Sequence, residues 1–575
     1  MSEALKLQHT NMSQSGLSLE EALRYLTSHD PRFEFGSVRI RGVNYNAFTA
    51  VPASIRDFLA VARTEQAHGD FLVFGDRCWS YEEFLDDVEK LGGALQKKLA
   101  VGKGQPVAIA MQNRPEMLIA FMAITSIGAV AVFVNAWWTT QELDYAMRDS
   151  GARLVLADQK RADRLAPLSV DVGFAIIGVG IDGADVSYED LLALDHAIAP
   201  VAIDTDDDMS IMYSSGTTGH PKGVVHTHRS AINAVYTWLM QTELLRLRAP
   251  TTADAPKPLR PCFMVITPLF HVTASHASFL FSVAAGAKLV LMDKWNAEDA
   301  VQLIDRHQVT RFVGVPTQSA ELIGAAQRRG SKLPSLSTIG SGGAKQPPAQ
   351  VAKVKTAFPH VQPATGWGMT ETNALGFGIT GPDYVTRPNA SGRLYPPLQE
   401  IRFVNDDSRE VPVGEVGEII VKSPCNMRCY LNKAEATAEI LQDGWLRTGD
   451  MGMIDSEGII TIVDRKKNII VRGGENIACL DVEAALHRHP AVVEACVFPV
   501  PDDRLGEVVG AALYLSEPLA EDDLRAFLGG HIAQFKIPTH IWTFDEPLPR
   551  GATGKIDSRS LRATCLLVIT SNEAS

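Results

Sequence analysis

The chain has 575 residues, of which 46% are hydrophobic and 21% charged, with a formal net charge of −13 at pH 7. This length exceeds what one hydrophobic core supports, so we expect a globular protein of at least two domains. The acidic balance argues against nucleic acid as the main partner, because binding to a phosphate backbone needs a basic face.

The cysteines and the N-terminus favour a cytoplasmic protein. Seven cysteines are scattered along the chain, and only Cys425 and Cys429 lie close together. No nearby Cys or His completes a metal site around this pair, so isolated reduced thiols are predicted. The first residues, with Lys6 and His9, lack the apolar core of a signal peptide.

Residues 1–50 are polar and weakly patterned, and they predict a loosely attached extension. A helical run then passes through Leu95 and Leu99 and is followed by a strand at 107–110. The uncharged segment 117–134 is long enough to span a membrane. Because polar and glycine residues interrupt it and its second half is β-branched, we interpret it as a buried helix followed by a buried parallel strand.

The alternation of helices and strands continues after residue 260. Strands are predicted at 263–266, 288–292, 311–315 and 337–339, with helices at 276–285 and 297–307. Strands that alternate with helices imply βαβ units and mostly parallel sheets. We therefore expect two similar α/β layers, with ligands at the carboxyl ends of the strands.

The pattern changes in the last third of the chain. The segments 400–404, 417–421 and 458–463 alternate with period two and predict an antiparallel, barrel-like subdomain. Past Lys467 we expect a strand at 469–471, a helix at 482–489, a strand at 494–498 and a final helix at 520–532. The predicted fold class is α/β, with a large domain at 51–466 and a small, mobile α+β domain at 467–575.

A glycine-rich segment at 213–223 has the composition of a phosphate-binding loop. Its glycines let backbone N–H groups approach a polyanion, and Lys222 adds a positive charge. The hydroxyl donors are Ser214, Ser215, Thr217 and Thr218. The spacing differs from a Walker loop, and a polar surface loop is the alternative interpretation.

The segment Gly366-Trp367-Gly368-Met369-Thr370-Glu371 combines an aromatic ring, a hydroxyl and a carboxylate. Trp367 could stack on a base, Thr370 could contact a phosphate oxygen, and Glu371 could hold Mg²⁺, which prefers oxygen ligands. A turn with a half-buried tryptophan explains the same residues.

Three later motifs carry single candidate residues. Asp450 suits a ribose diol, because an ionised carboxylate accepts from both hydroxyls. Arg465 could reach the ribose or the α-phosphate, although a solvated hairpin turn is the default for such a charged cluster. Lys555 lies in a glycine-containing loop, where a lysine is usually solvated.

These motifs, in this order, resemble those of the adenylate-forming superfamily, which includes acyl-CoA synthetases, coumarate-CoA ligases, luciferases and the adenylation domains of peptide synthetases. The resemblance extends from about residue 50 to 565 and is strongest to free-standing acyl-CoA synthetases. It implies that ATP and Mg²⁺ activate a carboxylic acid to an acyl-adenylate, and that CoA then takes the acyl group and releases AMP.

The resemblance also implies a role for each matching residue. The catalytic residues would be Lys555, Glu371 and Thr370, with Glu371 also the metal ligand, and the small domain would rotate at Lys467 to bring Gly473 and Gly474 to the acyl group. ATP would be bound by Ser214, Ser215, Gly216, Thr217, Thr218, Gly219, Lys222, Gly343, Ala344, Gly366, Trp367, Gly368, Met369, Asp450 and Arg465. The acyl pocket would include His271, Val272, Gly342 and Ala374.

Several positions depart from the family pattern or bear on the substrate. Trp367 stands where tyrosine is usual, Asn468 replaces a common acidic residue, and Ala478-Cys479 alters the predicted thiol-acceptor site. The small, uncharged segments 272–275 and 374–378 predict an apolar acyl group, and the absence of aspartate at His271 disfavours amino acids. A carrier-protein phosphopantetheine as acceptor, a non-catalytic nucleotide-binding role, peripheral membrane contact and a homodimer stay open.

Overall fold

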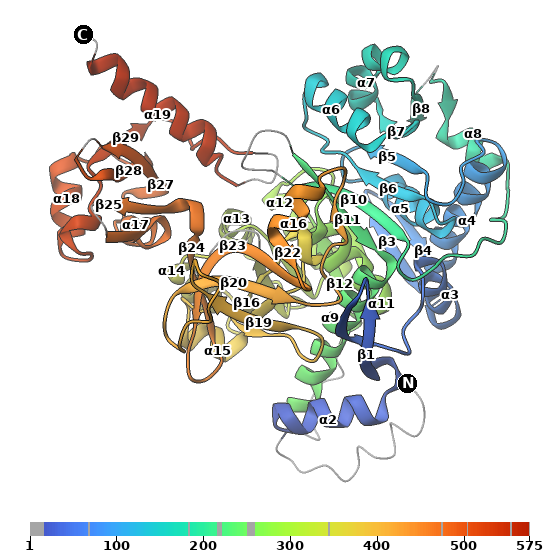
Figure 1. The fold of residues 1–575 in the computed structure, drawn as a ribbon, viewed down its shortest axis with the longest axis horizontal. Helices are drawn as coiled ribbons and strands as arrows, with labels where there is room; N and C mark the ends of the chain where they lie inside the picture. Colours follow the sequence, from blue (N-terminus) through green and yellow to red (C-terminus); the bar gives the residue numbers. More distant parts are fainter. Residues whose placement is uncertain are drawn as a thin grey trace.

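The computed structural model describes residues 16–573, apart from 67–68, 182–183, 215–220, 250–258, 343–345, 473–474, 503 and 552–554. The chain forms a mixed α/β protein with a large N-terminal domain and a smaller C-terminal domain, as predicted (Figure 1). The C-terminal helix packs on a strand of the smaller domain and lies on the outer side of the molecule (Figure 1).

The first layer is an eight-stranded sheet in the order β21-β11-β10-β6-β5-β7-β8-β9. Its strands from β10 to β9 are parallel, whereas β11 and β21 pair antiparallel at one edge. The strands are β5 (Pro106–Ala110), β6 (Val130–Phe133), β7 (Leu154–Asp158), β8 (Ala175–Val179), β9 (Val186–Ser187), β10 (Asp208–Ser214), β11 (Lys222–Thr227) and β21 (Cys429–Tyr430). The helices of this part are α3 (Ile55–Gln66), α4 (Tyr81–Lys97), α5 (Pro115–Ser126), α6 (Thr140–Ser150), α7 (Gln159–Val172), α8 (Tyr188–Ala193) and α9 (His228–Arg248).

The second layer is a nine-stranded sheet in the order β18-β17-β16-β15-β14-β12-β13-β3-β4. Its central strands from β16 to β3 are parallel. The strands are β3 (Asp70–Phe74), β4 (Arg77–Ser80), β12 (Cys262–Val265), β13 (Lys288–Leu291), β14 (Arg311–Gly314), β15 (Thr338–Gly342), β16 (Gln362–Trp367), β17 (Phe377–Thr380) and β18 (Arg393–Leu394). The helices are α10 (Val272–Ala274), η3 (Ser275–Leu280), α11 (Phe281–Ala284), α12 (Ala297–His307), α13 (Pro316–Arg329), α14 (Pro348–Ala357), η4 (Thr370–Thr372) and α15 (Gly381–Thr386).

The predicted period-two segments form an antiparallel sheet of five strands. They are β19 (Glu400–Val404), β20 (Gly417–Lys422), β22 (Leu441–Gln442), β23 (Trp445–Ile454) and β24 (Ile460–Arg465), with helix α16 (Ala434–Ile440) before β22. The sheet packs beside β16 and β17 through a cluster that includes Phe377, Phe403 and Ile419. This packing brings the end of β16 against the middle of β23.

The C-terminal domain has its own five-stranded sheet and hydrophobic core. It consists of η5 (Lys466–Asn468), β25 (Ile469–Arg472), β26 (Glu475–Ala478), α17 (Cys479–Leu486), β27 (Val492–Asp502), β28 (Gly506–Leu515), α18 (Glu521–Gly529), η6 (Gln534–Lys536), β29 (His540–Phe544) and α19 (Ser558–Glu573). Our expectation of a final helix at 520–532 was wrong, since α19 follows α18. Where this domain begins, at residue 467, stays a proposal.

The N-terminal residues differ from the expected loose extension. Residues 19–48 form α2 (Leu19–His29), η2 (Pro31–Phe33) and the hairpin β1 (Phe35–Ile40) and β2 (Val43–Phe48). Ala22, Leu26, Phe33 and Phe48 are buried in the main core, and α2 packs on α9. These apolar residues are widely spaced, so the sequence pattern did not predict that this segment packs on the core. In the folded chain, helix α2 places Ala22 and Leu26 on the same face.

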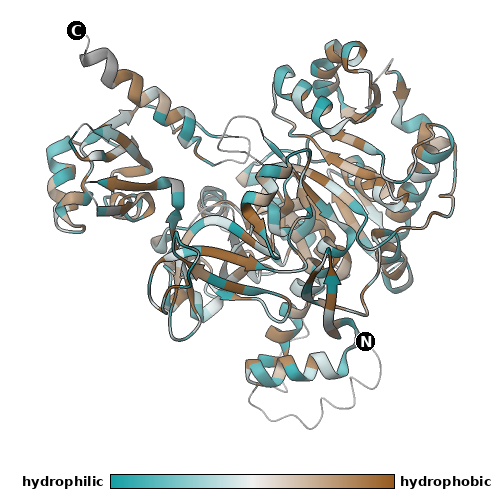
Figure 2. Cartoon of the chain, in the orientation of Figure 1, coloured by the Kyte–Doolittle hydropathy of each residue, from teal (hydrophilic) through white to brown (hydrophobic). Residues whose placement is uncertain are grey.

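The apolar segment at 117–134 is buried, as predicted. Helix α5 is buried along almost its whole length, and β6 follows it in the centre of the first sheet. Figure 2 shows the strands of both large sheets as hydrophobic, whereas α2 and α18 are mostly hydrophilic. Among the described residues, no helix has both the length and the apolar character needed to cross a membrane.

Candidate active site

The predicted phosphate loop connects two paired strands. β10 and β11 run antiparallel, and Ser214 lies opposite Lys222 in their register. The register therefore brings the two ends of the loop together at the carboxyl end of β10. Ser215, Gly216, Thr217, Thr218 and Gly219 lie outside the described residues, as do Gly343 and Ala344.

Lys222 and Glu371 contact the same tyrosine. The Tyr430 hydroxyl donates a 2.7 Å hydrogen bond to Oε1 of Glu371, and the Lys222 ammonium lies 4.8 Å from the centre of the Tyr430 ring. Glu371 is 6% exposed. Burial raises the pKa of Glu371, whereas the Tyr430 hydrogen bond and the charges of Arg465 and Lys222 lower it. Tyr430 thus favours an ionised carboxylate at the predicted metal ligand.

A buried histidine fixes the backbone beside Glu371. The Nε2 atom of His226 lies 2.7 Å from the carbonyl oxygen of Thr370, and its Nδ1 atom lies 3.1 Å from the hydroxyl of Ser210. Burial lowers the pKa of His226 to about 4, so the ring is neutral at pH 7. Because a carbonyl only accepts, Nε2 carries the proton and Nδ1 accepts from Ser210. Glycine is required nearby at Gly368, where a Cβ would overlap the Ala374 carbonyl.

Trp367 contacts two other residues of the site. It ends β16 opposite Phe377 of β17, and the two rings stack with their centres 4.7 Å apart. Its indole N–H donates a 2.7 Å hydrogen bond to Oδ2 of Asp450. A Cβ at Gly376 would overlap the indole ring, so glycine is required there. The expected stacking on a base would have to use the face of Trp367 opposite Phe377.

Asp450, Arg465 and Lys555 form a charged group. Asp450 lies opposite Arg465 in the register of β23 and β24, and Nε of Arg465 lies 2.9 Å from Oδ1 of Asp450. Desolvation and the positive charge of Arg465 lower the pKa of Lys555, while Asp450 raises it. Arg465 is therefore an ion-pair partner of the buried Asp450, although 49% of its own side chain is exposed.

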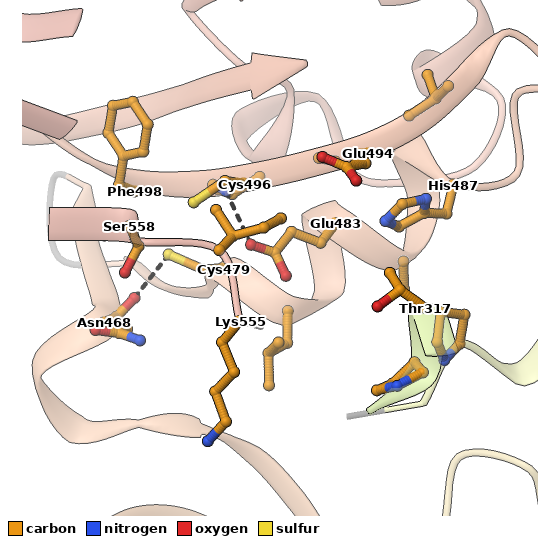
Figure 3. Close-up of a pocket in the computed structure, with 18 of the residues that line it drawn as sticks. Thr317, Asn468, Cys479, Glu483, His487, Glu494, Cys496, Phe498, Lys555 and Ser558 are labelled. Carbon is orange, nitrogen blue, oxygen red and sulfur yellow. Dashed lines mark hydrogen bonds between the residues drawn. The ribbon is translucent and has the colours of Figure 1, made fainter. Parts of the chain in front are cut away.

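A cavity of about 1490 Å³ opens between the two domains beside Lys555. Residues of α13 and α14 line one side, and residues of α17, β27 and α19 line the other. Figure 3 shows the Lys555 side chain extending away from Cys479 and Glu483 of α17. Lys467 lies in η5 next to this cavity's Asn468, and Gly473 and Gly474 lie outside the described residues.

Asp464 links the two sides of the predicted hinge. Its carboxylate is buried and accepts a 3.0 Å hydrogen bond from the backbone N–H of Leu480, in the first turn of α17. The residue before α17, Ala478, has no side chain that could cap the helix. Asp464 supplies this cap from the other side of Lys467.

The predicted acyl-pocket residues lie on neighbouring elements of the second layer. His271 and Val272 begin α10 after β12, and Gly342 ends β15. Burial and the positive charge of Lys555 lower the pKa of His271 to about 4, so its ring is neutral. A Cβ at Gly342 would meet no atom of the described residues within 4 Å. Ala374 has a φ of 63°, in the left-handed region that a residue other than glycine seldom adopts.

The structure therefore connects several of the described candidate residues, some through contacts and Lys555 through its charge. Lys222 and Glu371 meet at Tyr430, Trp367 and Arg465 meet at Asp450, and Lys555 influences both Arg465 and His271. Among the described residues, no group of three or more His, Cys, Asp or Glu side chains could hold a metal ion. A single carboxylate still fits Mg²⁺, which commonly takes one or two protein carboxylates together with substrate phosphates.

Sequence reasoning missed Tyr430, His226 and Asp464. Tyr430 lies 59 residues from Glu371 and belongs to none of the motifs. His226 follows the phosphate loop by a few residues, and its position on a buried strand was the only signal. Asp464 was recognised only as part of a charged cluster.

Comparison with known proteins identifies relatives across most of the chain. The family model described as AMP-binding enzyme matches residues 59–431, and the model of the AMP-binding enzyme C-terminal domain matches residues 481–555. A 3-[(3aS,4S,7aS)-7a-methyl-1,5-dioxo-octahydro-1H-inden-4-yl]propanoyl:CoA ligase of Rhodococcus jostii is 31% identical, covering 85% of this chain and 94% of its own length. A long-chain-fatty-acid–CoA ligase of Mycobacterium tuberculosis is 30% identical, covering 81% and 89%.

A solved structure shows the same fold with nucleotide bound. The o-succinylbenzoate coenzyme A synthetase of Bacillus subtilis, in complex with ATP and magnesium ion, matches with a TM-score of 0.74 and 28% identity. The match covers 88% of this chain and 99% of that one.

Proposed function

Because the chain belongs to the AMP-binding enzyme family, we propose that it activates an apolar carboxylic acid, either a fatty acid or a related acid. The chain is an adenylate-forming acid–CoA ligase that uses ATP, Mg²⁺ and CoA. The nature of the acid and the roles of the individual residues are our proposal.

The observation that carries the proposed substrate is the neutral His271 beside Val272. The pKa of about 4 leaves His271 without a charge that could pair with a second carboxylate close to the reacting one. Val272 and Ala274 are buried next to it, and the open space at Gly342 adds no polar side chain. These buried apolar neighbours favour an acid that is uncharged and largely apolar next to its carboxyl group, where His271 still offers one hydrogen bond through its Nε2, which has no partner among the described residues.

In the first half-reaction, a carboxylate oxygen attacks the α-phosphorus of ATP and the bond to pyrophosphate breaks. Ser214 and Lys222 bind the phosphates, Asp450 accepts from the ribose hydroxyls, and Arg465 orients Asp450. Lys555 offsets the negative charge that develops on the phosphate oxygens. Glu371 is the residue that would hold Mg²⁺, and the ion would supply positive charge that reduces the repulsion between the two anions.

In the second half-reaction, the thiol sulfur of CoA attacks the acyl carbon and AMP leaves with the oxygen that joined them. We propose that the C-terminal domain first turns at Lys467, which moves Lys555 away and brings Gly473 and Gly474 to the acyl group. A hinge of this kind needs only one residue that absorbs a large change of φ and ψ.

The test is to incubate the purified chain with ATP, Mg²⁺, CoA and acids from acetate to long-chain and aromatic acids, measuring AMP and acyl-CoA together. AMP and thioester should rise in step for apolar acids. Highest activity on amino acids would contradict the apolar pocket. A carrier protein should be compared with free CoA as acceptor, and a preference for the carrier would contradict our choice of acceptor.

The cytoplasmic location and the homodimer stay predictions from the sequence. A sedimentation measurement would test the second of these directly.

A further inference from the structure

Arg311 is a deep-lying arginine that the reaction described above does not use. It begins β14 in the middle of the second sheet, and its side chain is only partly exposed. Its guanidinium carbon lies 5.5 Å from the centre of the Phe263 ring and 5.4 Å from that of Phe281. Desolvation lowers the pKa of Arg311, although an arginine keeps its charge at any ordinary pH.

The guanidinium has no acceptor in the part of the chain that the structure describes. Neither a hydrogen bond nor an ion pair joins the Arg311 side chain to any described residue. Arg161, which is fully buried, instead donates to the Ala136 carbonyl, to Gln112 and to Asp158. The two phenylalanine rings stabilise the charge of Arg311, but they leave its five N–H donors without oxygen partners.

Arg311 lies on the face of the sheet that carries the predicted acyl pocket. In the parallel register Arg311 lies beside Thr338, and Gly342 follows Thr338 by four residues on the same strand. Residues an even number apart share a face of a strand, so Arg311 and Gly342 share a face. The rise of a strand places Arg311 about 13 Å from the level of Gly342, away from the reacting carboxyl group.

Between these two positions the shared face carries Gly340 of β15 and Val313 of β14, which lie side by side in the register. Gly366 and Gly378 continue the level of Gly342 across β16 and β17. A Cβ at Gly342 would meet nothing within 4 Å, and one at Gly366 would meet only the Phe377 carbonyl, at 3.6 Å. An apolar acyl chain could therefore lie over these glycines and extend towards Arg311.

Tyr395 lies on the same face, at the level of Gly342. A Cβ at Gly378 would overlap the Tyr395 hydroxyl, so the missing side chain at Gly378 makes room for it. Tyr395 is partly exposed, and burial raises its pKa, a rise that the charge of Arg311 opposes. The phenol thus borders the row of glycines, and Arg311 is the charged donor at the far end of the face.

We propose that Arg311 determines substrate specificity by binding an oxygen at the far end of the acid. The substrate would be an acid that is apolar near its reacting carboxyl group and carries a keto or carboxylate oxygen at its other end. This inference rests on the proposed function and narrows the class of acid that the enzyme would activate. A charged donor left without its acceptor is unfavourable, so an acid lacking this oxygen would bind less tightly.

The test compares matched acids on the wild-type chain and on Arg311→Met, which keeps the length of the side chain and removes its donors. The pairs are 9-oxodecanoate with decanoate, for a keto oxygen, and decanedioate with decanoate, for a carboxylate. In the wild type, kcat/KM for at least one oxygenated acid should exceed that for decanoate by about 10-fold to 100-fold. In Arg311→Met this preference should disappear, while decanoate is used as well or better.

A control variant and a binding measurement make a negative result with Arg311→Met interpretable. Arg402→Met removes an exposed arginine that lies over the Trp445 ring, and it should leave the preference unchanged. Calorimetric binding of the same acids without ATP tests Arg311 even if no acid is turned over, which would itself contradict the proposed function. Equal binding and equal kcat/KM for the oxygenated and plain acids in the wild type would overturn the inference, as would a preference that survives in Arg311→Met.

Discussion

The indole N–H of Trp367 donates to Oδ2 of Asp450, and Arg465 binds the other oxygen of the same carboxylate. This hydrogen bond joins the end of β16 in the nine-stranded sheet to β23 in the antiparallel sheet. Asp450 is 3% exposed and held at both oxygens, so its orientation is set before a nucleotide arrives.

We predict that Trp367→Phe raises KM for ATP by about tenfold, because a hydrogen bond to a charged group is lost. The variant keeps a ring that can stack on Phe377, so kcat at saturating ATP and KM for the acid should change little. Steady-state kinetics with each substrate varied in turn measures this. Trp445→Phe, on the same strand as Asp450, is the matched control. A rise in KM for the acid equal to that for ATP would argue for general disorder of the site instead.

Tyr430→Phe should shift the acidic limb of the pH–rate profile to higher pH. Glu371 must be ionised to hold Mg²⁺, and burial already raises its pKa. The Tyr430 hydroxyl opposes this rise, so its removal raises the pKa further and protonates Glu371 at a higher pH. The measurement is adenylation against pH at several Mg²⁺ concentrations. An unchanged acidic limb, with activity otherwise retained, would show that Tyr430 does not control this carboxylate.

Lys555 should control the alkaline limb. Desolvation and Arg465 lower its pKa, so the ammonium is lost at a lower pH than for an ordinary lysine, and adenylation falls as the pH rises through that value. Lys555→Arg, which stays charged, should retain part of the rate and lose the alkaline limb. The readout is ATP–pyrophosphate exchange between pH 7 and 10.

Lys555→Ala should lower adenylation by about 10²-fold to 10³-fold, as removal of a transition-state charge partner commonly does. Transfer of the acyl group from a supplied acyl-adenylate to CoA should continue at nearly the wild-type rate. Lys536→Ala, which removes an ion pair with Asp481 in the same domain, serves as the control. Equal losses in both half-reactions would contradict a role confined to adenylation.

Substitutions at Gly342 should change substrate size preference without affecting stability. A Cβ there meets no atom within 4 Å, so Gly342→Ala should alter the free energy of unfolding by less than about 0.5 kcal/mol. Gly342→Val should reduce kcat/KM for large acids more than for small ones. Denaturant titration measures the change in stability of Gly342→Ala, and kcat/KM across the series from acetate to long-chain acids measures the size preference of Gly342→Val.

Gly368→Ala offers the opposite case, because its Cβ would overlap the Ala374 carbonyl. That variant should be destabilised and lose activity with every acid.

For Gly342→Val, an equal loss of kcat/KM with large and small acids would mean that Gly342 does not line the acyl pocket.

The sequence predicted those elements of the fold that have a clear local pattern of apolar and polar residues. The buried pair α5 and β6 was predictable, because a long uncharged run followed by β-branched residues has few other solutions. The π-helical turn at η3 was not, because a π-helix depends on i→i+5 bonding that no residue pattern specifies. Our prediction there of a helix at 276–285 began four residues too late.

For the site, the sequence supplied the motif residues but not their partners. Trp367 and Asp450 were each singled out, yet their hydrogen bond depends on how two sheets pack, 83 residues apart in sequence. Nothing in the sequence singled out Arg311, because it is the first residue of an ordinary predicted strand at 311–315. Its lack of an acceptor becomes visible only when the side chains around it are placed.

The cap that Asp464 provides to α17 implies a mechanical bias in the enzyme. Asp464 precedes Lys467 and Leu480 follows it, so a turn of the C-terminal domain at Lys467 separates the carboxylate from the helix amides. If the C-terminal domain turns at Lys467 as we propose, breaking this hydrogen bond adds to the free-energy cost of the turn. The observed domain arrangement would then be the resting one, and release of the Asp464 cap would be part of the step that precedes attack by CoA.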